Sequence, residues 1–484
     1  MKKLLLHTIA LAAFAASAVS AFADTPVTVS VDPTKPTFKI PDDYTGLSYE
    51  TQREEPGAGD GSYYFRPDNT ALINMFKTLG LKNLRIGGNT VDNLKVPIPT
   101  TADIDHLFQF AKAAGVKVIY SFRLRNGGDV QGTATQAKYI ADHYADSLLC
   151  FCMGNEPDLF LHNWNQYKAA WMPLYDAINA VVPNAKYVGP SLTSNSAPYA
   201  HDFARELWPT GKIVYITQHQ YAGGAGGAQK DPAKGIDLLL SKDWPVSKYQ
   251  RYYDQFVPGL NGAAWRLEEA NNFYNGGAKD ISDTFASALW GLDYLYWYGS
   301  HGAQGVNFHN GDQVAAGQNS TECRYASFIS SPGGYNAHPI AYGIKMFNLG
   351  SKGSFIPVTL NDGGINIVAY AVLGNDKSLY VTFINKEHVY PDASGVQDNV
   401  ALASIPPAAD VTLTGFGAGY TSGKMIVLTA PAVNTKEGVT LGGNGIKDDG
   451  SFVETWAPLP AAPADGTVHI RVPATSAVLV KLTP

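Results

Sequence analysis

The sequence predicts a (β/α)8 barrel followed by an antiparallel β-sandwich, and three observations support this fold class. Strand-like and helix-like segments alternate eight times between residues 44 and 347, as they do in such a barrel. After about residue 348, strand patterns recur with turn residues between them and without helical periodicity. The main alternative, a doubly wound open sheet, loses support because no G-x-G-x-x-G motif follows the first strand.

Each predicted barrel strand is a short apolar run, and a segment of helical periodicity follows it. The first helix carries Leu72, Met75, Phe76 and Leu79 on one face, and Pro183 ends a later one. The strands are expected at residues 44–50, 81–86, 116–122, 148–153, 185–189, 213–219, 263–267 and 305–308. The helices are expected at residues 69–79, 104–114, 134–144, 167–182, 199–207, 232–256, 281–298 and 339–347.

The sandwich is predicted from both ends of the chain. Residues 24–41 alternate between polar and apolar side chains as an exposed edge strand would, and they precede the barrel. We therefore expect a barrel domain at 42–347 and a sandwich domain built from 24–41 and 348–484. Its other strands are expected at residues 365–373, 379–384, 411–416, 425–429, 468–472 and 477–482.

The first 23 residues have the pattern of a secretory signal peptide. Lys2 and Lys3 precede an apolar stretch at 4–19, and Ala21-Phe22-Ala23 forms an A-x-A cleavage site before Asp24. The short basic region is typical of bacteria. We expect the mature protein in the periplasm or outside the cell, with no membrane segment after cleavage.

The composition narrows the classes of partner. The net charge is −6 without a basic run, which argues against nucleic acids and anionic membrane surfaces. Only 16% of the residues are charged and 12% are aromatic, which suits an extracellular protein that acts on carbohydrates. Three cysteines do not make a disulfide framework, and no metal-binding motif is present, so neither a cofactor nor a metal is expected. The oligomeric state is left open.

Candidate functional residues follow the predicted barrel strands, because catalytic groups of such barrels lie at the carboxyl ends of the strands. The fourth strand ends in Gly154-Asn155-Glu156-Pro157, and the seventh in Glu268-Glu269. Carboxylates at these two ends face each other across the barrel mouth, and a pair of carboxylates is the minimum equipment for glycoside hydrolysis. The other strand ends carry Glu50, Asn89, His219, Tyr221, His309 and Asn310.

Several stretches together resemble glycoside hydrolase family 79, which contains β-glucuronidases and heparanase. Gly154-Asn155-Glu156-Pro157-Asp158 is similar to the acid/base motif of clan A retaining glycosidases. The remaining stretches are Gly46-Leu47-Ser48-Tyr49-Glu50, Leu84-Arg85-Ile86-Gly87-Gly88-Asn89-Thr90, Gln218-His219-Gln220-Tyr221, Glu269-Ala270-Asn271-Asn272 and Tyr274-Asn275-Gly276-Gly277. The resemblance implies that Glu156 is the general acid/base and Glu269 the nucleophile, and that Asn155 holds the sugar 2-hydroxyl.

The choice between Glu268 and Glu269 rests on two arguments. Neighbouring side chains of a strand point to opposite faces, so only one of the two is expected in the pocket. The family pattern, a Glu followed by a small residue and Asn, selects Glu269. Glu268 is then expected to be structural and to pair with Arg266, while Tyr221 orients the Glu269 carboxylate. His219 is expected to be scaffold or a supporting donor.

Binding of a glucuronate needs donors for its carboxylate. In the β-glucuronidases that this chain resembles, tyrosine hydroxyls and backbone N–H groups serve, which implies Tyr274 and the pair Gly334-Tyr335 here. Glu50 and Asn89 would hold ring hydroxyls. An alternative is that two arginines after the third strand, Arg123 and Arg125, serve an acidic substrate.

The function expected from the sequence is a secreted, retaining exo-β-glucuronidase that hydrolyses terminal β-linked glucuronic acid, with a glucuronide or polysaccharide as substrate. One alternative is an endo-acting, heparanase-like enzyme, which the absence of a Lys/Arg cluster in the barrel loops disfavours. A second is a non-catalytic carbohydrate-binding protein on a barrel scaffold. A third is a clan relative acting on arabinose or xylose units.

Overall fold

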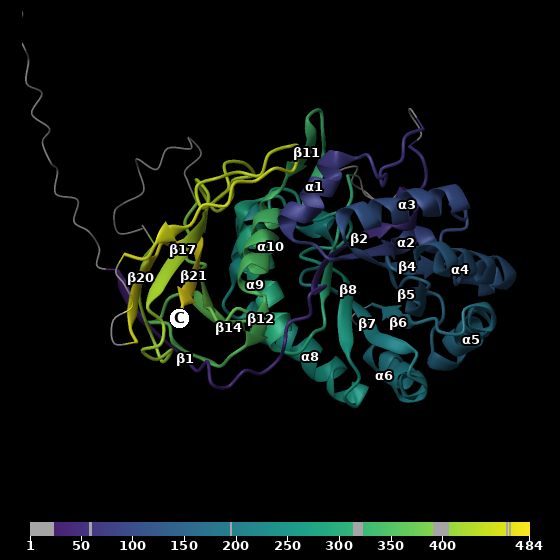
Figure 1. Cartoon of the computed structure of the whole chain (residues 1–484), viewed down its shortest axis with the longest axis horizontal. Coiled ribbons are helices and arrows are strands. Elements are labelled where there is room, and N and C mark those ends of the chain that lie inside the picture. Colours follow the sequence, from purple (N-terminus) through teal and green to yellow (C-terminus); the bar gives the residue numbers. More distant parts are fainter. Residues whose placement is uncertain are drawn as a thin grey trace, which may run out of the picture.

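The computed structural model describes residues 24–57, 61–193, 196–312, 323–390, 406–460, 463 and 466–484 (Figure 1). The predicted signal peptide, residues 1–23, lies outside the described residues. Within the described part of the chain, no helix combines the length and apolar character needed to cross a membrane.

Eight parallel strands close into a barrel, so the predicted (β/α)8 fold is confirmed. Each strand pairs in parallel with the next, and the last pairs with the first through Thr45↔Val306 and Ser48↔His309. The strands are β2 (Thr45–Glu50), β3 (Asn83–Gly87), β4 (Lys117–Phe122), β5 (Leu148–Met153), β6 (Tyr187–Leu192), β7 (Ile213–Tyr221), β8 (Trp265–Asn271) and β9 (Val306–His309).

Most helices lie on the outside of the barrel (Figure 1), whereas α2 (Gly88–Val91) lies at its mouth. The other helices are α1 (Thr70–Leu79), α3 (Thr101–Ala114), α4 (Val130–Tyr144), α5 (Trp164–Val181), α6 (Ala197–Leu207), α7 (Pro232–Leu240), α8 (Arg251–Phe256), α9 (Phe285–Ser300) and α10 (Pro339–Gly350). The short 3-10 turns are η1 (Thr51–Glu54), η2 (Arg125–Gly127), η3 (Pro157–Leu159), η4 (Trp208–Thr210), η5 (Gly226–Ala228) and η7 (Pro258–Leu260), and η6 (Pro245–Gln250) is a π-helix.

Two of the predicted barrel elements differ in ways that matter for the site. The helix expected at 232–256 is broken after Leu240, where Ser241 leaves the helical region with ψ 136°, and a new helical segment starts at Pro245, a residue suited to the first turn of a helix. The strand expected at 263–267 continues to Asn271 as β8. Glu268 and Glu269 therefore lie within a buried strand and not after its end.

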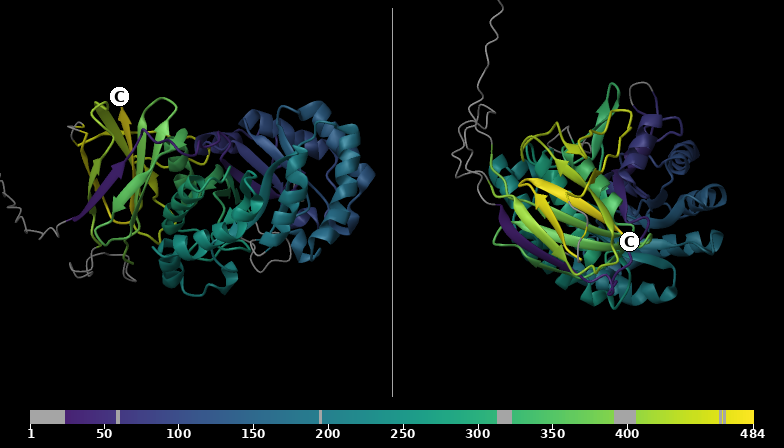
Figure 2. Two further views of the ribbon diagram at one scale, coloured as in Figure 1. Left: turned by 90° about the horizontal axis from the view of Figure 1, so that it is seen from below. Right: turned by 60° about the vertical axis from the view of Figure 1, so that its left-hand side comes forward.

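Antiparallel pairing dominates the predicted sandwich, which lies beside the barrel (Figures 1 and 2). One sheet has the order β13-β1-β16-β20, and the other β12-β14-β15-β21-β17-β18, with β19 paired to β17. Their bounds are β1 (Thr25–Val31), β12 (Gly353–Phe355), β13 (Val358–Asn361), β14 (Ile367–Gly374), β15 (Leu379–Asn385), β16 (Ala409–Thr414), β17 (Ser422–Thr429), β18 (Thr440–Leu441), β19 (Ala457–Pro458), β20 (Val468–Val472) and β21 (Ser476–Thr483). A separate hairpin, β10 (Phe328–Ser331) and β11 (Gly334–Ala337), precedes α10.

The N-terminal strand β1 belongs to the sandwich, but the expectation of an exposed edge strand is wrong. It pairs antiparallel with β13 on one side and parallel with β16 on the other. Alternating burial along β1 shows that one face of the strand packs on a core. It does not show whether the edges of the strand are paired, so the sequence pattern could not predict the two neighbouring strands. The exact domain boundaries stay a prediction.

Helices α9 and α10 lie between the barrel and the sandwich (Figure 1). Every residue from Phe285 to Gly299 of α9 is buried, as expected for a helix that is covered on all sides. Asp293 of α9 accepts hydrogen bonds from Lys386 Nζ at 2.9 Å and Tyr370 Oη at 2.6 Å, both on the sandwich. This contact joins the two parts through a fully enclosed ion pair.

Candidate active site

The chain turns sharply where β5 ends, and this turn aims Glu156 into the barrel mouth. Gly154 has φ 83°, and a Cβ there would lie 2.9 Å from the Cβ of Leu124. Glu156 itself has φ 45°, an uncommon conformation for a residue with a side chain. Backbone bonds hold the turn: the Asn155 N–H donates to Asp92 Oδ2 and the Glu156 N–H donates to the Ser191 carbonyl, each at 2.8 Å.

Glu269 on β8 sits among positive and hydrogen-bonding groups. Arg85 Nη1 lies 2.7 Å from its Oε2, and Tyr221 Oη donates to its Oε1 at 2.9 Å. His309 Nδ1 and His219 Nδ1 lie 3.5 and 3.9 Å from its oxygens. Burial alone would raise the pKa of Glu269, but His309, His219, Arg85 and the Tyr221 hydrogen bond outweigh it and lower that pKa to about 2. Glu269 is therefore ionised at neutral pH.

The groups around Glu269 are tuned in the complementary direction. Burial would lower the pKa of His219 and His309, but neighbouring carboxylates outweigh it and raise both. Burial, with the charge of Glu269, raises the pKa of Tyr221 well above its usual value. The Tyr221 phenol therefore keeps its proton and can donate it in a hydrogen bond to the carboxylate.

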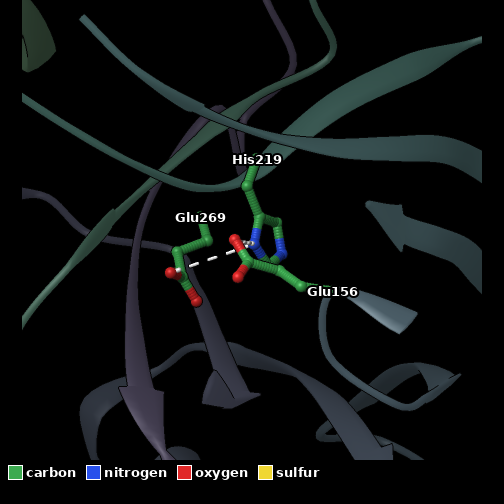
Figure 3. Close-up of side chains that lie close together, drawn as sticks. All are labelled: Glu156, His219 and Glu269. Atoms are coloured by element: carbon green, nitrogen blue, oxygen red, sulfur yellow. Dashed lines mark hydrogen bonds and ion pairs between the residues drawn. The ribbon is translucent and has the colours of Figure 1, made fainter. Parts of the chain in front are cut away.

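His219 bridges the two carboxylates (Figure 3). Its Nδ1 lies 3.0 Å from Glu156 Oε1, and its Nε2 lies 3.1 Å from Ser191 Oγ. One ligand atom each of Glu156, His219 and Glu269 lie within 4.8 Å of one another. These three side chains could also hold a metal ion by geometry, but Arg85 already supplies a positive charge 2.7 Å from Glu269. The arrangement is that of two carboxyl groups facing a common space.

Glu268 also points into the barrel, so the expectation that neighbouring Glu side chains face opposite sides is wrong here. The pairing of β8 shifts register against both neighbours, between Gln218 and His219 and between Leu267 and Ala270. Glu268 Oε1 lies 4.0 Å from His219 Nε2, its side chain is fully buried, and neither oxygen has a hydrogen-bond partner among the described residues.

The expected pairing of Glu268 with Arg266 is not found either. The Arg266 guanidinium instead lies 3.4 Å from Asp43 Oδ2 and donates to Asn307 Oδ1 at 2.9 Å. Glu268 is thus a buried carboxyl below the mouth, and it does not line the cavity.

A cavity of about 640 Å³ opens at the carboxyl ends of the strands, and most predicted binding residues line it. Its walls include the predicted residues Glu50, Asn89, Glu156, Tyr221, Glu269 and Tyr274. Glu50 accepts hydrogen bonds from the backbone and hydroxyl of Thr90, both at 2.7 Å. Asn155 lies just behind the wall, where it accepts from Arg85 Nη2 at 2.7 Å and donates to Asn89 Oδ1 at 3.1 Å.

Gly334 and Tyr335 do not line this cavity, so their expected position is wrong. They belong to β11, and the Tyr335 N–H donates a hydrogen bond to the carbonyl of Asp448 at 2.7 Å. The Tyr335 hydroxyl accepts from Asn69 Nδ2 at 2.7 Å, and its ring packs edge-on against Tyr64. The hairpin directs both residues toward α1 and the sandwich loops.

Arg123 and Arg125, the alternative for an acidic substrate, also lie away from the cavity lining. Arg123 donates to the carbonyls of Val91, Asn93 and Val96, which hold the loop after α2. The guanidinium of Arg125 lies 5.2 Å from the centre of the Phe160 ring. Both arginines therefore contact other parts of the protein outside the cavity lining.

Sequence reasoning assigned no role to Arg85 and His309, which flank Glu269. Arg85 is a fully buried cation between Leu84 and Ile86 on β3. The sequence feature that could have identified it as a functional residue is a charged residue inside an otherwise apolar strand. His309 follows the same rule as the other candidates, since it ends β9. Its partners, Glu50 at 3.5 Å and Glu269 at 3.5 Å, come from distant parts of the chain.

Part of the chain matches the model of a known protein family. Residues 369–479 match the family model "Glycosyl hydrolase family 79 C-terminal beta domain". The predicted resemblance to family 79 is confirmed.

The chain is also similar to two curated relatives in sequence and to a solved structure in fold. The chain is 26% identical over 358 residues to a beta-glucuronidase of Neurospora crassa, covering 62% of this chain and 61% of the relative. It is 25% identical over 205 residues to heparanase of Mus musculus, covering 40% and 38%. The chain thus spans less than two thirds of these relatives. A 4-O-alpha-L-rhamnosyl-beta-D-glucuronidase structure from Fusarium oxysporum shares the fold, with a TM-score of 0.70, 20% identity and coverage of 94% and 100%.

Proposed function

We propose that the protein is a retaining exo-β-glucuronidase that hydrolyses terminal β-linked glucuronic acid. The observation that carries the proposal is the pair Glu156 and Glu269, with carboxylate oxygens within 4.8 Å of each other in one cavity. Retaining glycosidases separate their two carboxyl groups by about 5–5.5 Å, whereas inverting ones need about 6.5–9.5 Å to admit a water molecule. The short separation supports double displacement.

In the first step, the ionised Glu269 attacks the anomeric carbon, and the bond to the leaving oxygen breaks. Glu156 supplies the proton that this oxygen takes up. Arg85 and His309 keep Glu269 ionised, and Tyr221 fixes the direction of its carboxylate. In the second step, Glu156 removes a proton from water, which attacks the same carbon and releases both the sugar and Glu269.

The other predicted residues are proposed to bind the glucuronate ring. Asn155 would hold the 2-hydroxyl from behind the wall, in a direction set by Arg85 and Asn89. Glu50 and Asn89 would hold other ring hydroxyls, and the hydroxyl of the exposed Tyr274 would donate to the ring carboxylate. Glu50, Asn89 and Tyr274 border the cavity directly, whereas Asn155 lies immediately behind its wall.

The first experiment is a panel of chromogenic aryl glycosides. We expect cleavage of the β-D-glucuronide in preference to the matching β-glucoside, β-xyloside and arabinoside, and loss of that cleavage in Glu269→Ala. Folding of the variant is checked by circular dichroism. A folded wild-type protein that ignores the glucuronide, or a variant that keeps ordinary turnover, would refute the proposal.

A second candidate is an endo-acting enzyme, which the match to the mouse heparanase favours. The size profile of a digested glucuronate-containing polymer separates the two modes. Exo attack releases monosaccharide without early shortening of the chains, whereas endo attack shortens them at once. The first pattern is the one expected.

Export of the protein is part of the proposal. Lys2, Lys3 and the A-x-A site before Asp24 support cleavage of a signal peptide. N-terminal sequencing of the mature protein is expected to begin at Asp24.

A further inference from the structure

One wall of the cavity is a stripe of polar side chains from a single helical segment. After the break that follows Leu240, η6 begins at Pro245 and runs into α8 without leaving helical backbone angles, since Gln250 and Arg251 have φ near −60° and ψ near −45°. The stripe consists of Lys248, Arg251, Tyr252 and Gln255, and all four line the cavity. Their spacing of three, four and seven residues is that of one helix face.

Packing against the barrel fixes which face of this segment the cavity receives. Tyr252 is buried, and its hydroxyl donates to Gln218 Oε1 of β7 at 3.3 Å. Tyr249 is buried as well, and its hydroxyl accepts from Trp290 Nε1 of α9 at 2.7 Å. Phe256 packs edge-on against Trp265 of β8. These aromatic anchors hold the segment against the barrel. Tyr252 also borders the cavity, and Lys248, Arg251 and Gln255 line it beside Tyr252.

Lys248 and Arg251 carry positive charges that the described residues do not neutralise. Both are exposed, and neither forms an ion pair or hydrogen bond within the described ranges. Other cations nearby behave differently: Lys234 pairs with Asp231 at 3.5 Å, and Lys242 pairs with Asp362. Two unpaired cations on one face of a ligand-sized cavity are thus available to an anion.

The floor and the rim of the cavity have opposite charge. The carboxylates Glu50, Glu156 and Glu269 lie at the strand ends, where the proposed chemistry holds the glucuronate ring. Lys248 and Arg251 line the same cavity and are exposed to solvent, so their charges are accessible to a part of the substrate outside the carboxylate cluster. An exposed cation attracts a mobile anion through water without a large desolvation cost.

We infer that Lys248 and Arg251 bind a carboxylate or sulfate group on the sugar next to the glucuronate, so that the substrate is an acidic oligosaccharide. This inference rests on the proposed function and adds the chemical class of the leaving group to it. It differs from an overall preference for anions, because the net charge of the chain is −6 and the positive charge is local. Arg251 can meet a planar carboxylate with two N–H groups, and Lys248 adds a point charge.

The test compares three disaccharides whose first sugar is the same β-linked glucuronate. The second sugar is galactose, galacturonate or 6-O-sulfated galactose, so the substrates differ only in the anionic group. The measured quantity is the ratio of kcat/KM for each acidic substrate to that for the neutral one, from released glucuronic acid. At low salt the wild-type ratio is expected to be about tenfold for at least one anion, since two partly exposed ion pairs contribute.

The double variant Lys248→Gln/Arg251→Gln is expected to bring this ratio to about one. Sodium chloride is expected to lower the wild-type ratio, because screening shortens the reach of exposed charges to about 8 Å at physiological ionic strength. The matched control is Lys112→Gln/Lys234→Gln, which removes two exposed cations outside the cavity lining and should keep the wild-type ratio. The carboxylate and sulfate arms identify which anion is preferred.

Three results would overturn the inference without affecting the proposed function. The first is a wild-type ratio near one, and the second is a ratio that the double variant retains. The third is an equal loss on all three disaccharides, which would assign the cations to the glucuronate carboxylate itself. If the wild-type protein cleaves neither the disaccharides nor an aryl β-glucuronide, the proposed function fails, and this inference fails with it.

Discussion

Two buried ion pairs in this molecule contain the same types of group, a carboxylate, a cation and a tyrosine hydroxyl, but they lie in different surroundings. At the barrel mouth, Glu269 meets Arg85 at 2.7 Å and the Tyr221 hydroxyl at 2.9 Å. Between barrel and sandwich, Asp293 meets Lys386 at 2.9 Å and the Tyr370 hydroxyl at 2.6 Å. All four charged residues are at most 7% exposed.

The difference lies in what else each carboxylate faces. Glu269 lines a cavity of about 640 Å³ and shares it with a second carboxyl group, Glu156. Asp293 of α9 is buried against the sandwich, which supplies both of its partners, Tyr370 and Lys386. A cation, a tyrosine and a carboxylate therefore do not by themselves indicate catalysis. The open space and the second carboxyl group do, and the comparison can be broken or sharpened by substitution.

The largest effect is expected from Glu269→Gln, with Glu268→Gln as its matched control. Both changes remove a buried carboxylate from the same strand and keep its size. Glu269→Gln is expected to lower kcat on an aryl β-glucuronide on the order of 10⁴-fold or more, because the nucleophile is lost. Glu268→Gln is expected to stay within about tenfold of wild type, since Glu268 does not line the cavity. Equal losses would refute the assignment of the nucleophile.

An intermediate effect is expected from Arg85→Gln, because it removes the cation but leaves the nucleophile. The pKa of Glu269 is about 2 in part through Arg85, so removing Arg85 raises it. The acidic limb of the kcat/KM profile should then move to higher pH, and kcat/KM at its optimum should fall about 100-fold.

Arg85→Lys serves as the control for that pH shift. Lysine keeps a positive charge near Glu269. It lacks the second terminal nitrogen with which the Arg85 guanidinium contacts Asn155 while it contacts Glu269. The variant should therefore shift the acidic limb less than Arg85→Gln. A limb that stays in place in both variants would contradict the electrostatic role of Arg85.

The smallest effect on activity is expected at the second ion pair. Lys386→Met leaves Asp293 buried with an uncompensated charge, which should cost about 3–5 kcal/mol of unfolding free energy. The folded fraction should keep kcat and KM within about twofold, since the pair does not border the cavity. Urea denaturation and assays of the same samples measure both quantities.

The double variant Lys386→Met/Asp293→Asn should recover part of this loss, because no buried charge is then left unpaired. A large loss of turnover in folded Lys386→Met would show that the interface pair is coupled to the site.

Local sequence rules were sufficient for much of this protein. Period-3.6 and apolar-run patterns located the helices and strands of the barrel, because those patterns depend only on neighbours along the chain. Glycine and proline around Asn155 and Glu156 identified a strand end that must turn, and the turn is at the barrel mouth. Tyr221, Asn89 and Glu50 followed from the same rule, since parallel strands gather their carboxyl ends at one rim.

Other features depended on contacts between distant segments, and only the tertiary structure decided them. The register shifts of β8 turn both Glu268 and Glu269 inward, and a shift is set by the neighbouring strands. Arg85 contacts Glu269, although the two residues are 184 positions apart in the sequence. Strand β1 lies between two strands that come much later in the chain. Gly334 and Tyr335 belong to a hairpin that places them away from the cavity.

The sequence by itself therefore determined the fold class and the strand ends where chemistry belongs. Barrel closure determined which of those side chains meet, which charges they see and which wall carries Lys248 and Arg251. The physical reason is that backbone periodicity is local, whereas register, burial and electrostatic field are sums over segments that only the folded chain brings together.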